Sequence, residues 1–190
     1  MDIRDFFFRY RSYTPIPLAL IILYYARPSW PLTLIGFLVI LLGESIRFQG
    51  VRYAGGVTRT TKVGAPSLCT AGPFARLRNP LYLGNMVMYT GVVLFAGAPN
   101  LGAMLLLTWA FFLIQYSLIV SLEEETLVRL FGEEYETYRK HVPALIPRWT
   151  PWESPDQRQP QSFRKTLRTE KRTLQNVALI LLLIGVRSLL

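Results

Sequence analysis

The stretch GPFARLRNPLYLGN (residues 72–85) places two arginines, an asparagine and a proline immediately before a long apolar run. Asn79 is a residue type favoured at the N-cap of a helix, and Pro80 suits the first helical position, where its missing N–H costs nothing. The stretch therefore predicts a helix that begins at Pro80. A charged side chain beside an apolar span is costly unless it has a partner or a task, so Arg78 marks a candidate functional site.

Hydrophobic residues make up 51% of the chain and charged residues only 17%, which is unlike an ordinary soluble domain. They gather in the runs 16–26, 32–42, 81–97, 101–122 and 177–186. A membrane span needs about 20 apolar residues, so 101–122 qualifies alone and 81–97 nearly does. The short connections RPSWP and APN predict two helical hairpins. The expected fold is all-α: a membrane bundle of four spans, with a fifth apolar helix at the C-terminal end that either crosses the membrane or lies in its interface.

The basic residues, which give the chain a net charge of +9, lie almost entirely on one side of the predicted membrane spans. They fall in segments 4–11, 47–78 and 129–172, and only Arg27 and Arg187 lie on the other side of the predicted spans. This is the positive-inside asymmetry of plasma-membrane and endoplasmic-reticulum proteins. It predicts a multi-pass protein with a cytoplasmic N-terminus, whose charge partner is anionic membrane lipid and not nucleic acid.

The polar segments divide the chain, which we expect to form a single membrane domain over residues 1–190. The predicted parts are a first hairpin (1–47), a core (48–147), a Pro- and Gln-rich linker (148–172) and a C-terminal apolar helix (173–190). Segments 44–79 and 123–172 face the same side of the membrane. A polar site at the cytoplasmic face must therefore form where these two segments meet.

The second motif, EEETLVRLFGEEYETYRKHVPALIP (residues 123–147), follows directly on the fourth run. If the helix continues through Glu123, then Leu127, Phe131, Tyr135 and Tyr138 lie along one face. Gly132 lowers helix stability and predicts a bend. The motif therefore carries three adjacent carboxylates to the membrane surface, beside an aromatic helix face.

The two motifs have opposite polarity. A helix start leaves unpaired N–H groups and a partial positive charge, so Arg78 and the turn after it form an anion receptor, whereas Glu123 suits a cation. The plainer alternatives are that Arg78 snorkels to lipid phosphate, that Asn79 only caps its helix, and that the carboxylates form a solvated face. The pair favours a zwitterionic ligand, an amino acid moiety whose carboxylate meets Arg78 and whose ammonium meets Glu123.

These residues resemble a family, the integral-membrane S-adenosylmethionine-dependent methyltransferases that include isoprenylcysteine carboxyl methyltransferases and phospholipid methyltransferases. The resemblance covers residues 67–147, and its motifs are LCTAGPF, RNPLYLG, EEETLVRLFGEEYETY and HVPALIP, in the family's order and spacing. It implies that the chain moves a methyl group from S-adenosylmethionine to a lipophilic or lipidated acceptor, either a prenylated cysteine carboxylate or a phospholipid amine. The donor is already activated, so no metal is implied.

Residue by residue, the resemblance and the two-pole argument give a candidate site. The expected cofactor-binding residues are Ser67, Leu68, Cys69, Phe74, Arg78, Asn79, Pro80, Leu81, Tyr82, Glu123 and Glu124. Arg78 and Tyr82 are the candidate catalytic residues. An amine acceptor must also lose a proton, for which Tyr82, Tyr135, Tyr138 and Glu124 are candidate bases.

The chain departs from the family pattern at two informative positions. Asn79 replaces the usual histidine, so it keeps hydrogen bonding but cannot carry a proton. In the carboxyl-methylating branch an arginine precedes the glutamate pair by four residues, and here Ile119 stands in that place. The acceptor is therefore open between a phospholipid amine, a prenylated carboxylate and a small thiol. The rival function is that of a non-catalytic lipid-binding or assembly protein on the same scaffold.

Overall fold

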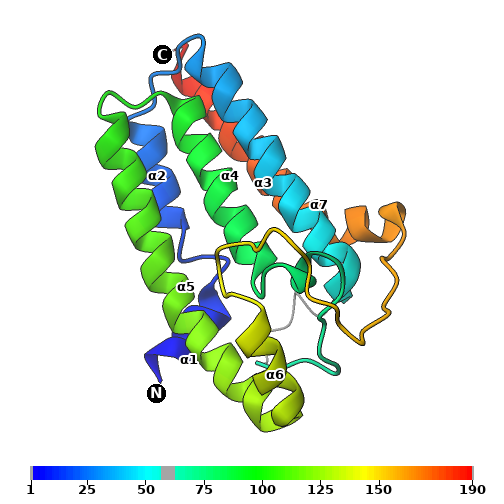
Figure 1. The fold of residues 1–190 in the computed structure, drawn as a ribbon. Helices are drawn as coiled ribbons and strands as arrows, with labels where there is room; N and C mark the ends of the chain where they lie inside the picture. Colours follow the sequence, from blue (N-terminus) through cyan, green and yellow to red (C-terminus); the bar gives the residue numbers. More distant parts are fainter. Residues whose placement is uncertain (1, 57–62, 190) are drawn as a thin grey trace.

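The computed structural model describes residues 2–56 and 63–189. Every regular element in these ranges is helical, which confirms the predicted all-α class. The elements are α1 (Ile3–Tyr10), α2 (Ile16–Tyr24), α3 (Leu32–Ala54), the 3-10 turn η2 (Gly72–Ala75), α4 (Pro80–Ala96), α5 (Leu101–Phe131), α6 (Glu133–His141) and α7 (Phe163–Arg187). They form an elongated bundle, with α6 and η2 at the end opposite the C-terminus (Figure 1).

Helices α3 and α4 share the most extensive contact of the bundle, and glycine makes it close. Gly43 and Gly36 of α3 face Gly84 and Gly91 of α4, so that each backbone fills the space a side chain would need. A Cβ atom on Gly43 would lie 2.5 Å from the amide nitrogen of Met88. Small residues at matching helical positions are typical of helix pairs packed inside a membrane.

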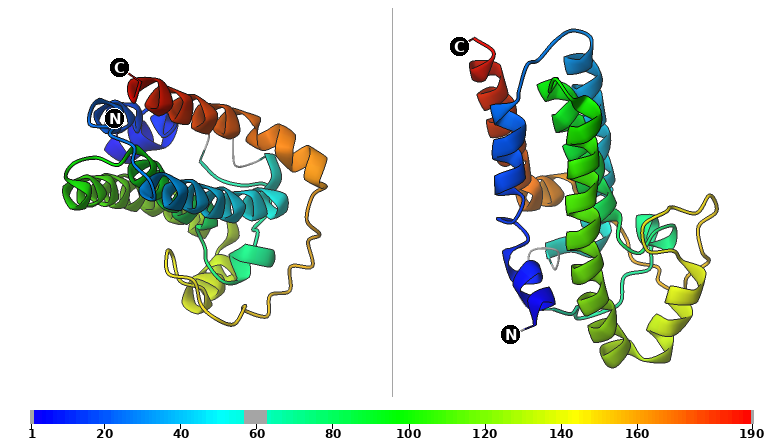
Figure 2. Two further views of the ribbon diagram at one scale, coloured as in Figure 1. Left: turned by 90° about the horizontal axis from the view of Figure 1, so that it is seen from above. Right: turned by 90° about the vertical axis from the view of Figure 1, so that its left-hand side faces the viewer.

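The first predicted hairpin, residues 1–47, is not a packed pair. Helix α2 contacts α4 and α7, and α4 lies between α2 and α3 (Figure 1). The connection passes over the end of α4, where the Arg27 N–H donates to the Ala96 carbonyl (2.7 Å). The second predicted hairpin, α4 with α5, does pack together. Helix α4 therefore contacts α2, α3, α5 and α7, and Figure 2 shows α2 beside α7 on one side of the bundle.

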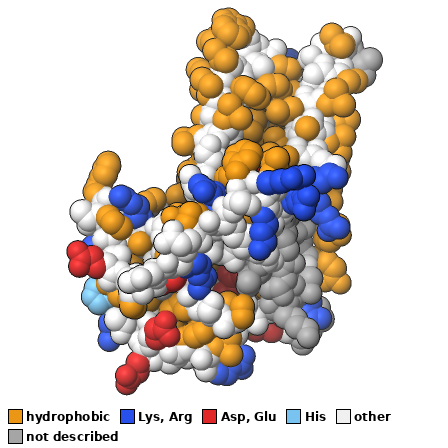
Figure 3. Space-filling model, turned by 90° about the vertical axis from the view of Figure 1, so that its right-hand side faces the viewer, with side chains coloured by type: hydrophobic (Ala, Val, Ile, Leu, Met, Phe, Trp, Pro, Cys, Tyr) orange, Lys and Arg blue, Asp and Glu red, His pale blue; other side chains and the backbone are white. Residues whose placement is uncertain are grey.

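Two helices in the described ranges, α3 and α5, are long and apolar enough to cross a membrane. Helix α4 is apolar but shorter, with 17 residues, and α2 has nine. Apolar side chains cover the half of the bundle that lies away from α6, and most of the charged side chains visible on the face shown in Figure 3 gather below it. The predicted count of four spans remains a prediction.

The polar end of the molecule is more ordered than the sequence indicates. Helix α5 continues past its apolar run to Phe131, and Gly132, with φ of 52°, separates it from α6, which confirms the predicted bend. The expected linker, residues 148–172, differs from the structure. Its last part is helical, because α7 begins at Phe163, and its first part, residues 148–162, lies against the segment 63–79 and is called the strap below.

Candidate functional site

Arg78 is held at the start of α4 by groups from two other segments. Its guanidinium donates to Glu124 (2.6 Å from Nη2 and 3.1 Å from Nε to Oε1) and to the carbonyls of Arg139 and Val142 at the end of α6. The side chains of Arg78 and Glu124 are only 11% and 18% exposed. A half-shielded pair of this kind is stronger than a surface ion pair. In this structure Arg78 therefore ties α4, α5 and α6 together, and its charge is already compensated.

Asn79 occupies the N-cap position, but its side chain does not cap the helix. Its amide nitrogen instead donates to the Ala144 carbonyl (3.1 Å), beside the bond from Arg78 N–H to the Pro143 carbonyl (2.9 Å). The expectation of a side-chain cap is therefore wrong, because the chain after α6 offers a carbonyl to that amide. The helix does begin at Pro80 as predicted.

Pro80 and Leu81 belong to the helix contact and not to the polar cluster. A Cβ on Gly50 of α3 would lie 2.7 Å from a methyl carbon of Leu81 and 3.5 Å from the Pro80 ring. These two residues fix where α4 starts relative to α3. Their role in the candidate site is therefore the placement of the first turn of α4.

Tyr82 and Glu123 form the centre of the candidate site. The Tyr82 hydroxyl donates to Oε2 of Glu123 (2.8 Å), and the Tyr82 ring stacks on Tyr116 of α5 with centroids 4.4 Å apart. Arg11, whose guanidinium donates to the Phe8 carbonyl, lies within electrostatic range of Glu123. The first turn of α4 and the polar end of α5 therefore face each other directly, as the two-motif argument expects.

The segment that carries Ser67, Leu68, Cys69 and Phe74 reaches the site through α6. Tyr138 donates to the Phe74 carbonyl (2.8 Å), and Leu68 packs against the buried cluster that includes Tyr138 and Tyr135. Burial raises the pKa of both phenols well above its usual value. At neutral pH both phenols therefore keep their protons, and both rings are buried packing residues. A role for either residue as a base stays a prediction.

The strap binds the same segment from outside, a contact that sequence reasoning missed. Arg158 donates to the Ser67 hydroxyl (2.9 Å) and to the Leu68 carbonyl (3.0 Å). The Thr70 N–H donates to the Asp156 carboxylate (2.9 Å). The composition of this segment predicts a linker. The sequence signal against a linker is the pair Asp156 and Arg158, which are two positions apart and can form a local turn.

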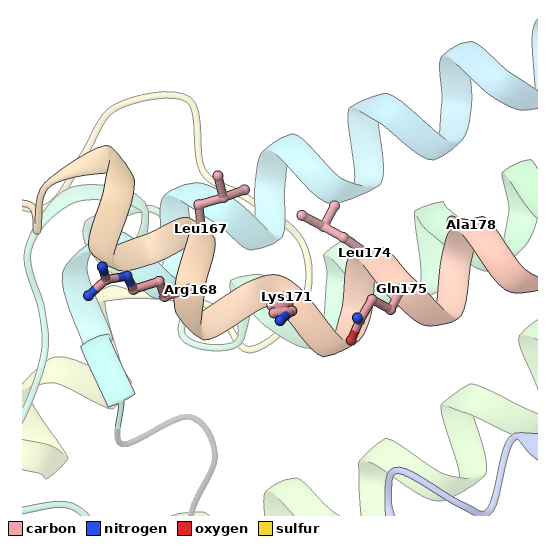
Figure 4. Close-up of a pocket in the computed structure, with 6 residues that line it drawn as sticks. All are labelled: Leu167, Arg168, Lys171, Leu174, Gln175 and Ala178. Carbon is pink, nitrogen blue, oxygen red and sulfur yellow. The ribbon is translucent and has the colours of Figure 1, made fainter.

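A groove of about 450 Å³ runs along α7, a helix that carries no predicted site residue (Figure 4). It is lined by Leu167, Arg168, Lys171, Leu174, Gln175 and Ala178. None of them is a predicted site residue. The groove is therefore a feature of the α7 surface and does not mark the candidate site.

Two further residues join the site from within the apolar runs. Asn85 donates from its amide nitrogen to the Tyr116 hydroxyl (2.8 Å). Both lie on helices that read as apolar spans, and Asn85 follows Tyr82 by three positions, which places the two on one helix face. That spacing was the available signal for Asn85.

Comparisons with known proteins place the chain in a family. The family model described as phospholipid methyltransferase matches residues 32–134, more than half of the chain. The chain belongs to this family. Membership, together with the apolar helices α3 and α5, identifies a membrane protein. The match contains α3, α4, α5 and the facing pair Tyr82 and Glu123, whereas the strap and α7 lie outside it.

Several curated proteins are similar to this phospholipid methyltransferase family member. It is 32% identical over 124 residues to the protein-S-isoprenylcysteine O-methyltransferase of Mus musculus, covering 63% of this chain and 42% of the mouse protein. The enzyme of that name from Schizosaccharomyces pombe is 33% identical over 120 residues, 60% of this chain and 48% of the relative. The nickel-cobalt-cadmium resistance protein NccN of Alcaligenes xylosoxydans xylosoxydans is 33% identical over 81 residues, 43% of this chain and 36% of the relative. This chain thus spans less than half the length of these relatives, and no solved structure matches.

The Cys69 thiol gives a first test of the described arrangement. Burial raises its pKa from the ordinary value of 9.0 to about 11, and only the thiolate is nucleophilic. At pH 8 the folded protein therefore holds about a hundredfold less thiolate than the unfolded chain. We expect alkylation by iodoacetamide, followed by mass spectrometry, to be at least that much slower in the folded protein than in a denatured control. Equal rates would show that the 63–79 segment is open to solvent.

Proposed function

We propose that this protein is a methyltransferase that moves a methyl group from S-adenosylmethionine to a lipophilic acceptor at the cytoplasmic face of a membrane. The observation that carries the proposal is the Tyr82 to Glu123 hydrogen bond of 2.8 Å, made where the first turn of α4 faces the polar end of α5. The family membership and the O-methyltransferase names of the relatives support it.

The residues present fit an amino acid moiety. Glu123 accepts a hydrogen bond from the neutral Tyr82 hydroxyl, which leaves carboxylate lone pairs to receive an ammonium group. The first turn of α4 supplies N–H groups suited to a carboxylate. The stacked Tyr82 and Tyr116 rings offer aromatic faces to a sulfonium through cation–π attraction. Arg78 and Glu124, being paired with each other, hold α6 and the chain after it against this site.

When bound, S-adenosylmethionine supplies a methyl group that its sulfonium already activates. The protein has to hold the acceptor in line and keep water out. Holding two reactants in attack geometry contributes on the order of 7–11 kcal/mol. The contacts of Arg78 and Tyr138 close the polar side of the site, while the acceptor enters from the apolar side of the bundle. This arrangement explains why such an enzyme is embedded in lipid.

The acceptor belongs to one of two classes. The relatives' printed names favour the carboxylate of a prenylated cysteine, and the family description favours a phospholipid amine. Ile119, which stands where the carboxyl-methylating branch has an arginine, is fully buried, so no guanidinium reaches the site from that position. We propose a multi-pass arrangement with the N-terminus in the cytoplasm, because the basic segments lie at the polar end of the bundle.

A transfer assay tests the function. The purified protein, reconstituted in lipid nanodiscs, is incubated with methyl-labelled S-adenosylmethionine and either an S-farnesylated cysteine derivative or phosphatidylethanolamine. We expect label in one acceptor and saturable binding of S-adenosylhomocysteine. If the demethylated cofactor binds neither in detergent nor in lipid, the non-catalytic lipid-binding or assembly function is favoured instead.

A further inference from the structure

A buried ion pair joins α7 to the centre of the bundle. Nη2 of Arg47, on α3, lies 2.8 Å from Oε2 of Glu170, on α7, and the two side chains are 8% and 0% exposed. Arg47 also lies 3.6 Å from Glu44, one turn earlier on α3. Removing such charges from water offsets most of their attraction, so a pair of this kind adds little net stability. The pair does fix the orientation of the Arg47 guanidinium relative to its neighbours.

Arg47 in turn fixes the orientation of the Asn85 amide. Nη1 of Arg47 donates to Oδ1 of Asn85 (2.6 Å). A guanidinium has no acceptor, so the amide oxygen must face Arg47 and the amide N–H must face the other way. There it donates to the Tyr116 hydroxyl oxygen (2.8 Å). Because Tyr116 accepts this bond, its own proton remains available to donate elsewhere.

Tyr116 connects this chain of bonds to the proposed cofactor site. Its ring stacks on Tyr82, with centroids 4.4 Å apart and planes 22° from parallel, and Tyr82 donates to Glu123 (2.8 Å). Tyr116 precedes Glu123 by seven residues on the same helix, which places it about 10 Å deeper into the apolar part of the bundle. It therefore lies on the apolar side of the bundle, from which the proposed acceptor would enter, and only 3% of the residue is exposed before an acceptor is bound.

We propose that Tyr116 binds an oxygen atom of the acceptor and that Asn85, Arg47 and Glu170 are positioning residues that keep its hydroxyl as a donor. Helix α7 is then part of the functional unit, although it lies outside the matched family region of residues 32–134. The inference rests on the proposed methyl transfer. In this arrangement Tyr116 contacts the acceptor, and α7 supports a site that is otherwise formed by α4 and α5.

The Asn85→Asp substitution tests the direction of the hydrogen bond between residue 85 and Tyr116, because an aspartate keeps the bond but reverses its donor and acceptor. The new carboxylate still accepts from Arg47, but towards Tyr116 it can only accept, so the Tyr116 proton is drawn away from the acceptor. We expect kcat/KM for the acceptor to fall at least about tenfold, the worth of one well-placed hydrogen bond. Affinity for S-adenosylhomocysteine should change less than twofold, and the Tm should not fall. Asn176→Asp, the same exchange at an exposed position of α7, should change none of these values.

Tyr116→Phe keeps the stacked ring and removes the hydroxyl, so we expect the same loss. If Asn85 and Tyr116 act through the same hydroxyl proton, the double variant should lose no more kcat/KM than either single variant does. Glu170→Gln should show a smaller loss of the same kind, because it keeps a hydrogen-bonding group but not the charge. Additive losses, or wild-type kcat/KM in Asn85→Asp, would overturn the inference.

A separate measurement keeps this inference distinct from the proposed function. Binding of the farnesylated cysteine derivative and of phosphatidylethanolamine is measured by titration with S-adenosylhomocysteine present. If the wild type transfers no methyl group, the proposed function fails, while weaker acceptor binding in Tyr116→Phe and Asn85→Asp still supports the acceptor contact. Equal binding by wild type and both variants would refute the contact whatever the activity.

Discussion

Glu123→Gln is expected to lose S-adenosylmethionine binding almost completely, with affinity falling about a hundredfold. The exchange keeps the size of the side chain and removes the negative charge that would receive the cofactor's ammonium. A charge-assisted hydrogen bond is worth roughly twice a neutral one, and the Tyr82 hydroxyl then faces a neutral amide. Isothermal titration of the purified protein with S-adenosylhomocysteine measures the change.

Glu125→Gln is the matched control for this substitution. It removes a carboxylate from the same helix, only two residues further on, where the side chain is 66% exposed and pairs with Arg4 (3.0 Å). An exposed pair contributes little, so affinity should stay near that of the wild type. Equal losses in the two variants would mean that overall negative charge matters at this end of the bundle, and would remove Glu123 from the ligand site.

Gly43→Leu is expected to prevent α3 and α4 from packing. The atoms nearest to its new Cβ would be backbone atoms of Met88 and Gly84 at 2.5–2.8 Å, and a helix backbone cannot move aside as a side chain can. Overpacking a core typically costs 1–3 kcal/mol, and a backbone collision lies at the upper end, about 3 kcal/mol or more. The thermal midpoint in detergent, or the loss of folded protein on size exclusion, reports it.

Gly102→Leu provides the comparison. It makes the same exchange in the first turn of α5, where a Cβ would have no atom within 4 Å. Leucine is a better helix former than glycine by roughly 1 kcal/mol, so this variant should be at least as stable as the wild type. If Gly43→Leu were equally stable, the close contact between α3 and α4 would not exist in solution.

Local signals in the sequence were sufficient where a helix end depends on its own residues. Pro80 begins α4 and Gly132 separates α5 from α6, as their backbone preferences predict. The continuation of α3 beyond the predicted first hairpin (1–47), as far as Ala54, was not predicted, because polar and charged residues after an apolar run resemble a loop. Arg47 is accommodated inside the bundle by Glu170, 123 positions away. No periodicity in either segment reveals such a partner.

The neighbours of α2 were missed for a related reason. A short connection predicts a hairpin, but it fixes only how far apart two helix ends lie. Matching glycines on α3 and α4 make that pair closer, and α2 is displaced to the other side of α4. The heptad spacing of Gly36 and Gly43, and of Gly84 and Gly91, was present in the sequence and could have predicted this pairing.

The candidate site was predicted in part. The two motifs predict that the start of α4 faces the polar end of α5. The structure agrees, because Tyr82 donates to Glu123 and Arg78 donates to Glu124. The partners contributed by the strap were not predicted, because Asp156 and Arg158 act through a backbone N–H and carbonyl and through the hydroxyl of Ser67. Contacts to backbone leave no complementary residue pattern in the sequence. The binding of ligands by these residues remains a prediction.

The link between Arg47 and Glu170 also constrains how the molecule is made. A ribosome delivers α3 to the membrane long before it translates α7, so during that interval the arginine lacks its C-terminal counter-ion. Folding therefore includes a docking step in which α7 brings Glu170 to a positive charge that α3 already carries.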